Sequence, residues 1–372
     1  MIQRQIKSII ENNFFKNKAI VIIGARQVGK TTLIKEIINQ KNFLFLDADD
    51  PITRKLLTNP STETLKSIVG NHTFVFIDEA QRIKNIGITL KIIVDQIKDI
   101  QLLVSGSSSF EIGNLINEPL TGRKWEYILY PISWQEYQDN IGYLKAEQAL
   151  ENRLLYGFYP DVLNNVGNER NILQQLVSSY LYRDVLSLSE IRKPEVLEKL
   201  IQALAFQIGS EVNYNELATI VGINKQTVQH YIQLLEQSFI VFRVPSFSRN
   251  LRNEIKHAKK IYFYDVGVRN AIINNFNPLD LRNDKGALWE NFLIAERLKQ
   301  NQYNQNYAKL YFWRTKQQQE IDLIEEVNGK LFSFEFKWKL TKKNISKTFT
   351  DAYTSEVAFI DRTNFREFIG AK

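Results

Sequence analysis

The chain has 372 residues, 44% hydrophobic and 24% charged, which is ordinary for a globular protein and long enough to predict two or three domains. It contains no cysteine, which excludes disulfides, thiolate zinc sites and thiol catalysis, and its apolar runs are strand-sized, which predicts no membrane span. The formal net charge of +7 favours a polyanionic partner. The N-terminus lacks the apolar core of a signal peptide, so we expect a cytoplasmic protein.

A phosphate-binding loop follows a short amphipathic segment, residues 1–16, that predicts a helix. Residues 24–31 read Gly-Ala-Arg-Gln-Val-Gly-Lys-Thr and fit the pattern G-x-x-x-x-G-K-[ST], between a predicted strand over 19–23 and a predicted helix over 32–38. In this frame backbone N–H groups turn around phosphate oxygens, and the helix N-terminus adds positive potential. The sequence therefore predicts a nucleoside triphosphate site.

We expect ATP and Mg²⁺ at this loop. Lys30 would reach the β- and γ-phosphates, and the Thr31 hydroxyl would ligate the metal ion. The other expected nucleotide contacts come from the loop and from the helix that follows it: Gly24, Ala25, Gln27, Val28, Gly29 and Thr32.

Two strand ends supply the residues expected for hydrolysis. The apolar run 73–77 ends in Asp78 and Glu79, and we expect Asp78 to hold Mg²⁺, directly or through water, while Glu79 polarises the attacking water. A polar residue after another apolar run, Ser105 or Ser107, would sense the γ-phosphate or the attacking water.

Alternation of strands and helices predicts the fold of this region. Apolar strands over 43–47 and 101–104 join those already named, and helical patterns separate them. This order favours an α/β fold with a parallel sheet covered on both faces, which we place at residues 1–132. From residue 133 to residue 207 the period becomes helical, and this segment resembles a helical lid in size and position.

Residues 208–272 predict a helix-turn-helix with a basic wing. Gly222 permits the turn, and the second helix presents polar side chains that can reach phosphates and base edges. The expected DNA contacts are Lys225, Gln226, Thr227 and Gln229 on that helix, with Arg249, Arg252 and Lys256 in the wing. This pattern favours DNA binding, and a module that only packs against protein is the alternative.

Carboxylates in residues 273–372 suggest a second centre. Two runs that predict paired strands carry Asp322 and the E-x-K group of Glu335 and Lys337, and a period of two places Glu335 and Lys337 on one face. An acid followed by E-x-K on the adjacent strand is the arrangement of PD-(D/E)XK nucleases. Asp322 and Glu335 would hold Mg²⁺ or Mn²⁺, with Glu290 as a further acid, and Lys337 would position or activate water. A fold that has lost cleavage, or a structural charge network with Arg314 and Lys316, is the alternative.

Taken together, the motifs resemble those of bacterial and archaeal AAA-type ATPases with a C-terminal domain of unknown function that has a restriction-endonuclease-like core. The matching segments run in the same order over nearly the whole chain: 24–31, 78–81, 105–107, 122–123, 182–184, 262–267, 289–291, 312–314 and 335–337. The resemblance implies an AAA-type P-loop ATPase with a helical lid, a winged helix-turn-helix and a C-terminal α/β nuclease-like domain.

The resemblance also implies a homo-oligomer, because AAA-type enzymes usually complete their site with an arginine from a neighbouring subunit. Arg123 is the first candidate and Arg183 the second; a surface salt bridge and a helix ion pair are their alternatives. The sequence thus favours an ATP-hydrolysing, DNA-binding protein whose C-terminal domain cleaves DNA or once did. An ATP-dependent switch or interaction protein with a silent nuclease-like domain is the other hypothesis.

Overall fold

The computed structural model describes residues 2–107, 119–178, 194–248, 259–315, 319–340, 347–353 and 355–371. The chain forms two compact units. The first comprises Met1–Pro131 and Gln237–Phe239, and the second comprises Ile132–Glu236 and Ile240–Lys372.

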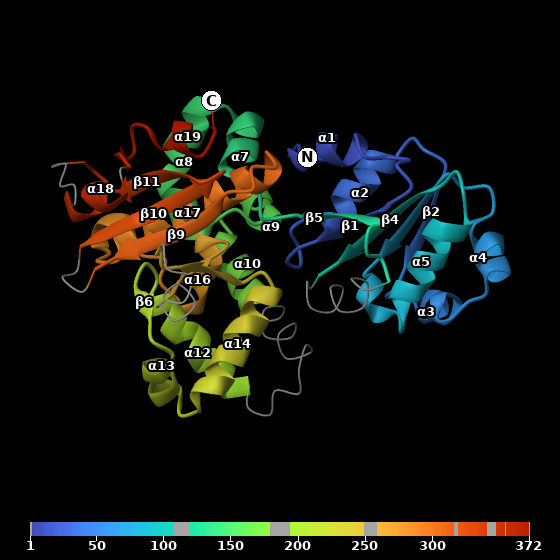
Figure 1. The fold of residues 1–372 in the computed structure, drawn as a ribbon, viewed down its shortest axis with the longest axis horizontal. Coiled ribbons are helices and arrows are strands. Elements are labelled where there is room, and N and C mark those ends of the chain that lie inside the picture. The colour runs from blue at the N-terminus through green and yellow to red at the C-terminus, as the bar shows by residue number, and fades with distance from the viewer. Residues whose placement is uncertain are drawn as a thin grey trace. The chain divides into compact units, whose positions relative to one another are not determined.

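A five-stranded parallel sheet forms the core of the first unit, with strand order β2-β3-β4-β1-β5 (Figure 1). Its strands are β1 (Ala19–Ile23), β2 (Phe43–Asp47), β3 (Phe74–Asp78), β4 (Gln101–Gly106) and β5 (Lys124–Ile128). Every residue of β1, β3 and β4 is buried, whereas the edge strands β2 and β5 are partly exposed. The prediction of a sheet covered on both faces, made from the continuous apolar runs, is therefore confirmed for the central strands.

The helices of this unit lie between the strands along the chain. They are α1 (Ile6–Glu11), α2 (Lys30–Ile38), α3 (Pro51–Leu57), α4 (Thr62–Val69) and α5 (Ile86–Gln96), with a 3-10 turn, η1 (Ala80–Arg82). The helix predicted over 1–16 is wrong in extent, since α1 ends at Glu11. Phe15 and Asn17 take positive φ values of 56° and 55°, which a helix does not tolerate, so the chain turns there before entering β1.

Helices dominate the first half of the second unit. They are α7 (Trp134–Ile141), α8 (Tyr143–Tyr156), α9 (Pro160–Asn164), α10 (Glu169–Leu176) and α12 (Pro194–Phe206). Helices α8, α10 and α12 contact α16 (Val266–Ile272), every residue of which is buried. The predicted helical period is confirmed for the described part of 133–207, and the lid role stays a prediction. Arg183 lies outside the described residues.

A helix pair and a small antiparallel sheet follow. Helices α13 (Tyr214–Val221) and α14 (Lys225–Gln237) are joined through Gly222, whose φ of 72° is left-handed. The three strands, in order β6-β8-β7, are β6 (Glu211–Val212), β7 (Val241–Pro245) and β8 (Lys259–Phe263). The predicted helix pair with its turn is confirmed.

The C-terminal part contains a four-stranded sheet in order β12-β11-β10-β9. Its strands are β9 (Lys309–Arg314), β10 (Glu320–Val327), β11 (Lys330–Phe336) and β12 (Val357–Ile360), and its helices are α17 (Lys285–Tyr303), α18 (Lys347–Tyr353) and α19 (Phe365–Phe368). Strands β10 and β11 pair, as their sequences predicted, and the pairing is antiparallel. Strand β12 returns parallel to β11 after α18.

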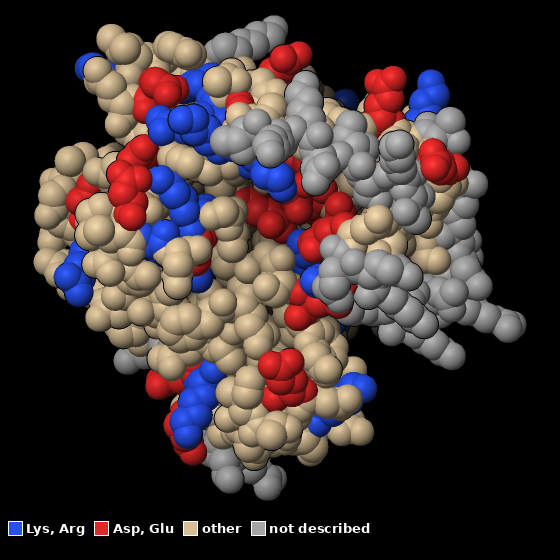
Figure 2. Space-filling view, turned by 90° about the vertical axis from the view of Figure 1, so that its left-hand side faces the viewer, with Lys and Arg blue, Asp and Glu red and all other residues tan. Residues whose placement is uncertain are grey.

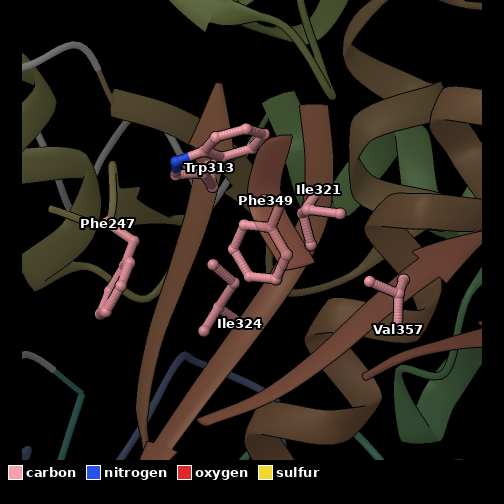
Figure 3. Close-up of a cluster of buried hydrophobic side chains, with 6 residues drawn as sticks. All are labelled: Phe247, Trp313, Ile321, Ile324, Phe349 and Val357. Atoms are coloured by element: carbon pink, nitrogen blue, oxygen red, sulfur yellow. The ribbon is translucent and has the colours of Figure 1, made fainter. Parts of the chain in front are cut away.

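Apolar side chains join the two sheets of the second unit. The backbone N–H of Phe247, just beyond β7, donates to the carbonyl of Phe312 in β9 at 2.6 Å. The Phe247 ring then lies in a cluster with side chains from β9, β10, α18 and β12, drawn in Figure 3: Trp313, Ile321, Ile324, Phe349 and Val357. The small sheet that carries β8 is therefore anchored to the C-terminal sheet.

Within the described part of the chain, no helix is both long enough and apolar enough to cross a membrane.

Candidate functional site

The phosphate loop runs from the carboxyl end of β1 to the first turn of α2, as the sequence predicted. Gly24 lies against Leu129, the residue just after β5. A Cβ added to Gly24 would be 2.2 Å from the carbonyl oxygen of Leu129. Gly29 precedes the helix with a φ of 95°, which favours glycine. Both glycines of the motif are therefore required by the backbone, one by close packing and one by conformation.

Lys30, Thr31 and Asp78 meet at the carboxyl edge of the sheet. The Lys30 ammonium donates to the carbonyl oxygens of Gly24 at 2.9 Å and Ala25 at 2.8 Å. The Thr31 hydroxyl donates to Asp78 Oδ2 at 2.7 Å, and the Ser105 hydroxyl donates to Asp78 Oδ1. One carboxylate thus collects hydroxyls that come from the phosphate loop and from β4.

These groups fit Mg²⁺ in the presence of a nucleotide. Carboxylate and hydroxyl oxygens are the hard donors that this ion prefers, and phosphates usually complete its shell. Asp78 is 7% exposed, so it is held in place but still accessible.

Glu79 stands beside this centre in a special backbone conformation. Its φ of 50° is left-handed, which turns the chain sharply after β3. The Gln81 side chain donates to Glu79 Oε2 at 2.6 Å and to Ser107 Oγ at 3.0 Å. Gln81 thus orients the expected water-polarising acid and links it to the polar end of β4. The sequence analysis assigned Gln81 no role. The only sequence signal for one is its position two residues after Glu79.

The remaining predicted nucleotide contacts differ in what they can offer. Val28 is fully buried, so only its backbone can face a phosphate. Ala25 is buried as well, whereas Gln27 and Thr32 are exposed. Arg4, which sequence reasoning missed entirely, donates to the carbonyl of Val28 at 2.8 Å.

Arg123 lies at the amino ends of the strands, whereas the phosphate loop lies at their carboxyl ends. It precedes β5, and its carbonyl accepts from Ala19 at the start of β1. Its guanidinium is 2.7 Å from Asp95 in an ion pair that is partly exposed. The surface salt bridge that the sequence left open is therefore present, and a role in a neighbouring subunit's site stays a prediction.

The second helix of the pair, α14, presents the residues predicted to contact DNA. Lys225, Gln226 and Gln229 are exposed, and Thr227 is half-buried. Asn224 caps the helix by accepting from the Thr227 backbone N–H at 2.8 Å and from its hydroxyl at 2.9 Å. The three wing residues lie outside the described residues: Arg249, Arg252 and Lys256.

Asp322, Glu335 and Lys337 come together in the C-terminal sheet. The Lys337 ammonium is 2.9 Å from Glu335 Oε2 and 3.9 Å from Asp322 Oδ2. Asp322 also accepts the backbone N–H of Phe336 at 2.7 Å, across the pairing of β10 with β11. The acid and the E-x-K group thus share one lysine, as the period-two pattern suggested.

Glu290 on α17 is held by residues from β8 that sequence reasoning did not assign to this site. The Lys260 ammonium, on a side chain with no exposure, is 3.0 Å from Glu290 and also pairs with Glu320. The Tyr262 hydroxyl donates to Glu290 at 2.6 Å. The pairing of β8 with β7 turns the Lys260 side chain inwards, a contact that no local pattern signals.

Asn291, the next residue on α17, fixes β8 in this position. Its side chain accepts the backbone N–H of Phe263 at 2.8 Å and donates to the Phe263 carbonyl at 2.9 Å. The two hydrogen bonds replace those that a neighbouring strand would make.

Burial shapes the protonation of these acids. It raises the pKa of Glu335 to about 7, with a further rise from the Asp322 charge, and it raises the pKa of Glu290 to about 7 against the opposing effect of Lys260. Burial lowers the pKa of Lys260, but the neighbouring carboxylates outweigh it and hold that pKa above its ordinary value. Lys260 therefore remains charged at neutral pH.

The acids do not gather as a three-ligand set. Among the residues that the structure describes, no group of three or more histidine, cysteine or acidic side chains is arranged to hold a metal ion. Glu290 is occupied by Lys260 and Tyr262, and Glu335 by Lys337. On the face drawn in Figure 2, acidic side chains gather in the middle with basic ones beside them.

Comparison with known proteins agrees with the first unit's geometry. A family model described as an AAA domain matches residues 16–138. The Walker-type ATPase PABY2304 of Pyrococcus abyssi, 14% identical, superimposes with a TM-score of 0.51 over 73% of this chain and 96% of that one, which shows a shared fold. The first unit has the fold and the motifs of a P-loop ATPase.

Outside the residues that the AAA domain model matches, the family models state no activity. Models described as domains of unknown function match residues 147–279 (DUF8612) and 285–364 (DUF4143). An uncharacterized protein of Mycobacterium tuberculosis is 27% identical over 338 residues, which cover 90% of this chain and 73% of that protein. An uncharacterized protein of Methanocaldococcus jannaschii is 23% identical, with 85% of this chain and 74% of that protein covered.

The raised pKa of Glu335 predicts a pH-dependent stability. An acid whose folded pKa lies above its unfolded value favours folding at low pH, and that contribution is lost as pH rises from about 4.5 through about 7. We expect Glu335→Gln to be more stable than the wild type by about 1–3 kcal/mol at pH 8 and to lose this advantage near pH 5. Denaturant unfolding across this range, with Glu326→Gln as the control, measures the difference. A difference independent of pH would contradict the assignment.

Proposed function

We propose that the protein is an ATP-hydrolysing, DNA-binding protein in which ATP turnover is coupled to DNA engagement. The observation that carries the ATP part is the convergence of the Thr31 and Ser105 hydroxyls on Asp78, at the end of a loop whose carbonyls hold the Lys30 ammonium. The DNA part rests on the exposed polar face of α14 and on the excess of basic residues in the chain.

The residues at the phosphate loop divide the work of hydrolysis. Backbone N–H groups at the start of α2 bind phosphate oxygens, and Lys30 exchanges its carbonyl partners for the β- and γ-phosphates. Thr31 and Asp78 are the residues that would hold Mg²⁺, which neutralises charge on the phosphates when bound. Glu79, oriented by Gln81, accepts a hydrogen bond from the attacking water and aims it at the γ-phosphate, while Ser105 reports occupancy of the site to β4.

Arg123 is our candidate for an arginine supplied to a neighbouring subunit of a homo-oligomer. Its half-exposed ion pair with Asp95 is weak enough to be exchanged for a phosphate. Arg183 is the second candidate.

Metal-dependent DNA cleavage is the second candidate function. The shared contact of Lys337 with Asp322 and Glu335 favours it. Against it, the acids of the described residues do not form a three-ligand set, and Glu290 and Glu335 are each paired with a lysine. The alternative is a silent nuclease-like domain in an ATP-dependent switch, with the same charges serving as a structural network.

Removing Lys30 tests the ATPase assignment. We expect Lys30→Ala to abolish ATP binding and turnover, because the phosphates lose their charged partner. Glu79→Gln is expected to bind ATP but to turn it over at least about 100-fold more slowly, since only the water-polarising carboxylate is lost. Phosphate release and calorimetric ATP binding measure both. Lys35→Ala, an exposed lysine on the same helix, is the control, and turnover by Lys30→Ala would refute the site.

Charge removal on α14 tests DNA binding. We expect Lys225→Ala to weaken duplex binding and to reduce the salt slope by about 1, because one phosphate contact is lost. Fluorescence anisotropy at several salt concentrations measures both quantities. Lys199→Ala removes an exposed charge from α12 and serves as the control. Equal affinities for all three proteins would leave α14 with a packing role.

Cleavage assays decide between an active and a silent C-terminal centre. End-labelled single-stranded, duplex, forked and junction DNA would be incubated with Mg²⁺ or Mn²⁺, with and without ATP. If the centre is active, Asp322→Ala and Glu335→Ala lose cleavage and Glu326→Ala, a half-buried acid on the same sheet, keeps it. Cuts that persist in Asp322→Ala would point to a contaminant, and binding without any cut would favour the silent domain.

A further inference from the structure

A phosphate loop works only if its peptide groups point the right way. In a trans peptide the C=O and the following N–H point in opposite directions, so fixing one fixes the other. The peptide between Val28 and Gly29 lies immediately before α2, where its N–H can face a phosphate. Whatever holds the Val28 carbonyl therefore also aims the Gly29 N–H.

Arg4 holds this carbonyl from outside the loop. Its Nη1 donates to Val28 O at 2.8 Å, and its Nη2 donates to Tyr130 O at 2.6 Å. The residue is only 8% exposed, and Nη1 would lie 3.9 Å from a Cβ placed on Gly29. A buried, permanently charged guanidinium thus bridges the end of the phosphate loop and the chain just beyond β5.

The other end of the loop rests on the same segment. Gly24 is packed against the carbonyl of Leu129, and the Leu129 N–H donates to Ile23 at 2.8 Å. Residues 129 and 130 therefore brace both ends of the loop, at one end by direct packing and at the other through Arg4.

We propose that Arg4 is a positioning residue for the nucleotide phosphates. By anchoring the Val28 carbonyl away from the nucleotide, it presents the Gly29 N–H to a phosphate, and its fixed charge adds to the positive potential at the loop. The inference rests on the proposed ATPase function and extends it to a residue twenty positions before the loop's first glycine.

Steady-state turnover and calorimetric ATP binding with Mg²⁺ test this role in the full-length protein. For Arg4→Met we expect a KM and Kd for ATP raised about ten- to a hundredfold, with kcat at saturation kept, because the loss of a charge-assisted hydrogen bond weakens phosphate binding alone. Arg4→Lys keeps the charge but replaces the fork that spans two carbonyls, and an intermediate KM is expected. If Arg4→Met does not fold, Arg4→Lys alone carries the test.

Lys7→Met is the matched control. Lys7 lies on α1 and pairs with Glu36 of α2 at 2.7 Å, so its loss loosens the same N-terminal helix without touching the loop. An Arg4→Met variant with the KM of the wild type would overturn the proposal. A reduced kcat with unchanged KM would overturn it too, because that result indicates only that fewer molecules are folded. Absence of ATP binding by the wild type would instead overturn the proposed function itself.

Discussion

Burial of both faces of the parallel sheet is the constraint on which the first unit depends. Polar side chains are excluded from the centres of β1, β3 and β4. The polar residues of the candidate site therefore lie at the carboxyl ends of these strands. Asp78 occupies that edge and accepts from two hydroxyls that reach it from other elements. Because the strands end together, residues far apart in sequence become one site.

The second unit depends on a shared strand. Strand β8 belongs to the small sheet beside the helix pair, yet its residues reach α17 and the C-terminal carboxylates through Lys260 and Tyr262. Four carboxylates there face two lysines. Of the two lysines, Lys260 has no exposure and therefore needs its acidic partners, since an unpaired buried charge costs several kcal/mol. Strand β8 therefore connects the small sheet to the C-terminal carboxylates.

Local patterns were sufficient wherever the structure is regular over a short stretch. The phosphate loop, the apolar strands and the turn at Gly222 were predicted because each needs particular residues at fixed spacing. The helix over 1–16 was predicted too long, because the positive φ values at Phe15 and Asn17 have no composition signal. The sequence did not predict that Gln81 contacts Glu79, because this hydrogen bond depends on the left-handed backbone turn at Glu79.

The sequence by itself determined the nucleotide chemistry of this protein, because phosphate binding requires glycines, a lysine and a hydroxyl in one contiguous loop. It also predicted which strands would pair around Asp322 and Glu335, because alternation sets the faces of a sheet. Only the tertiary structure decided that Arg4 braces the loop and that Lys260 faces acids rather than solvent. Both are single basic side chains whose partners lie more than twenty residues away, and the direction of such a side chain is set by packing, which no local pattern records.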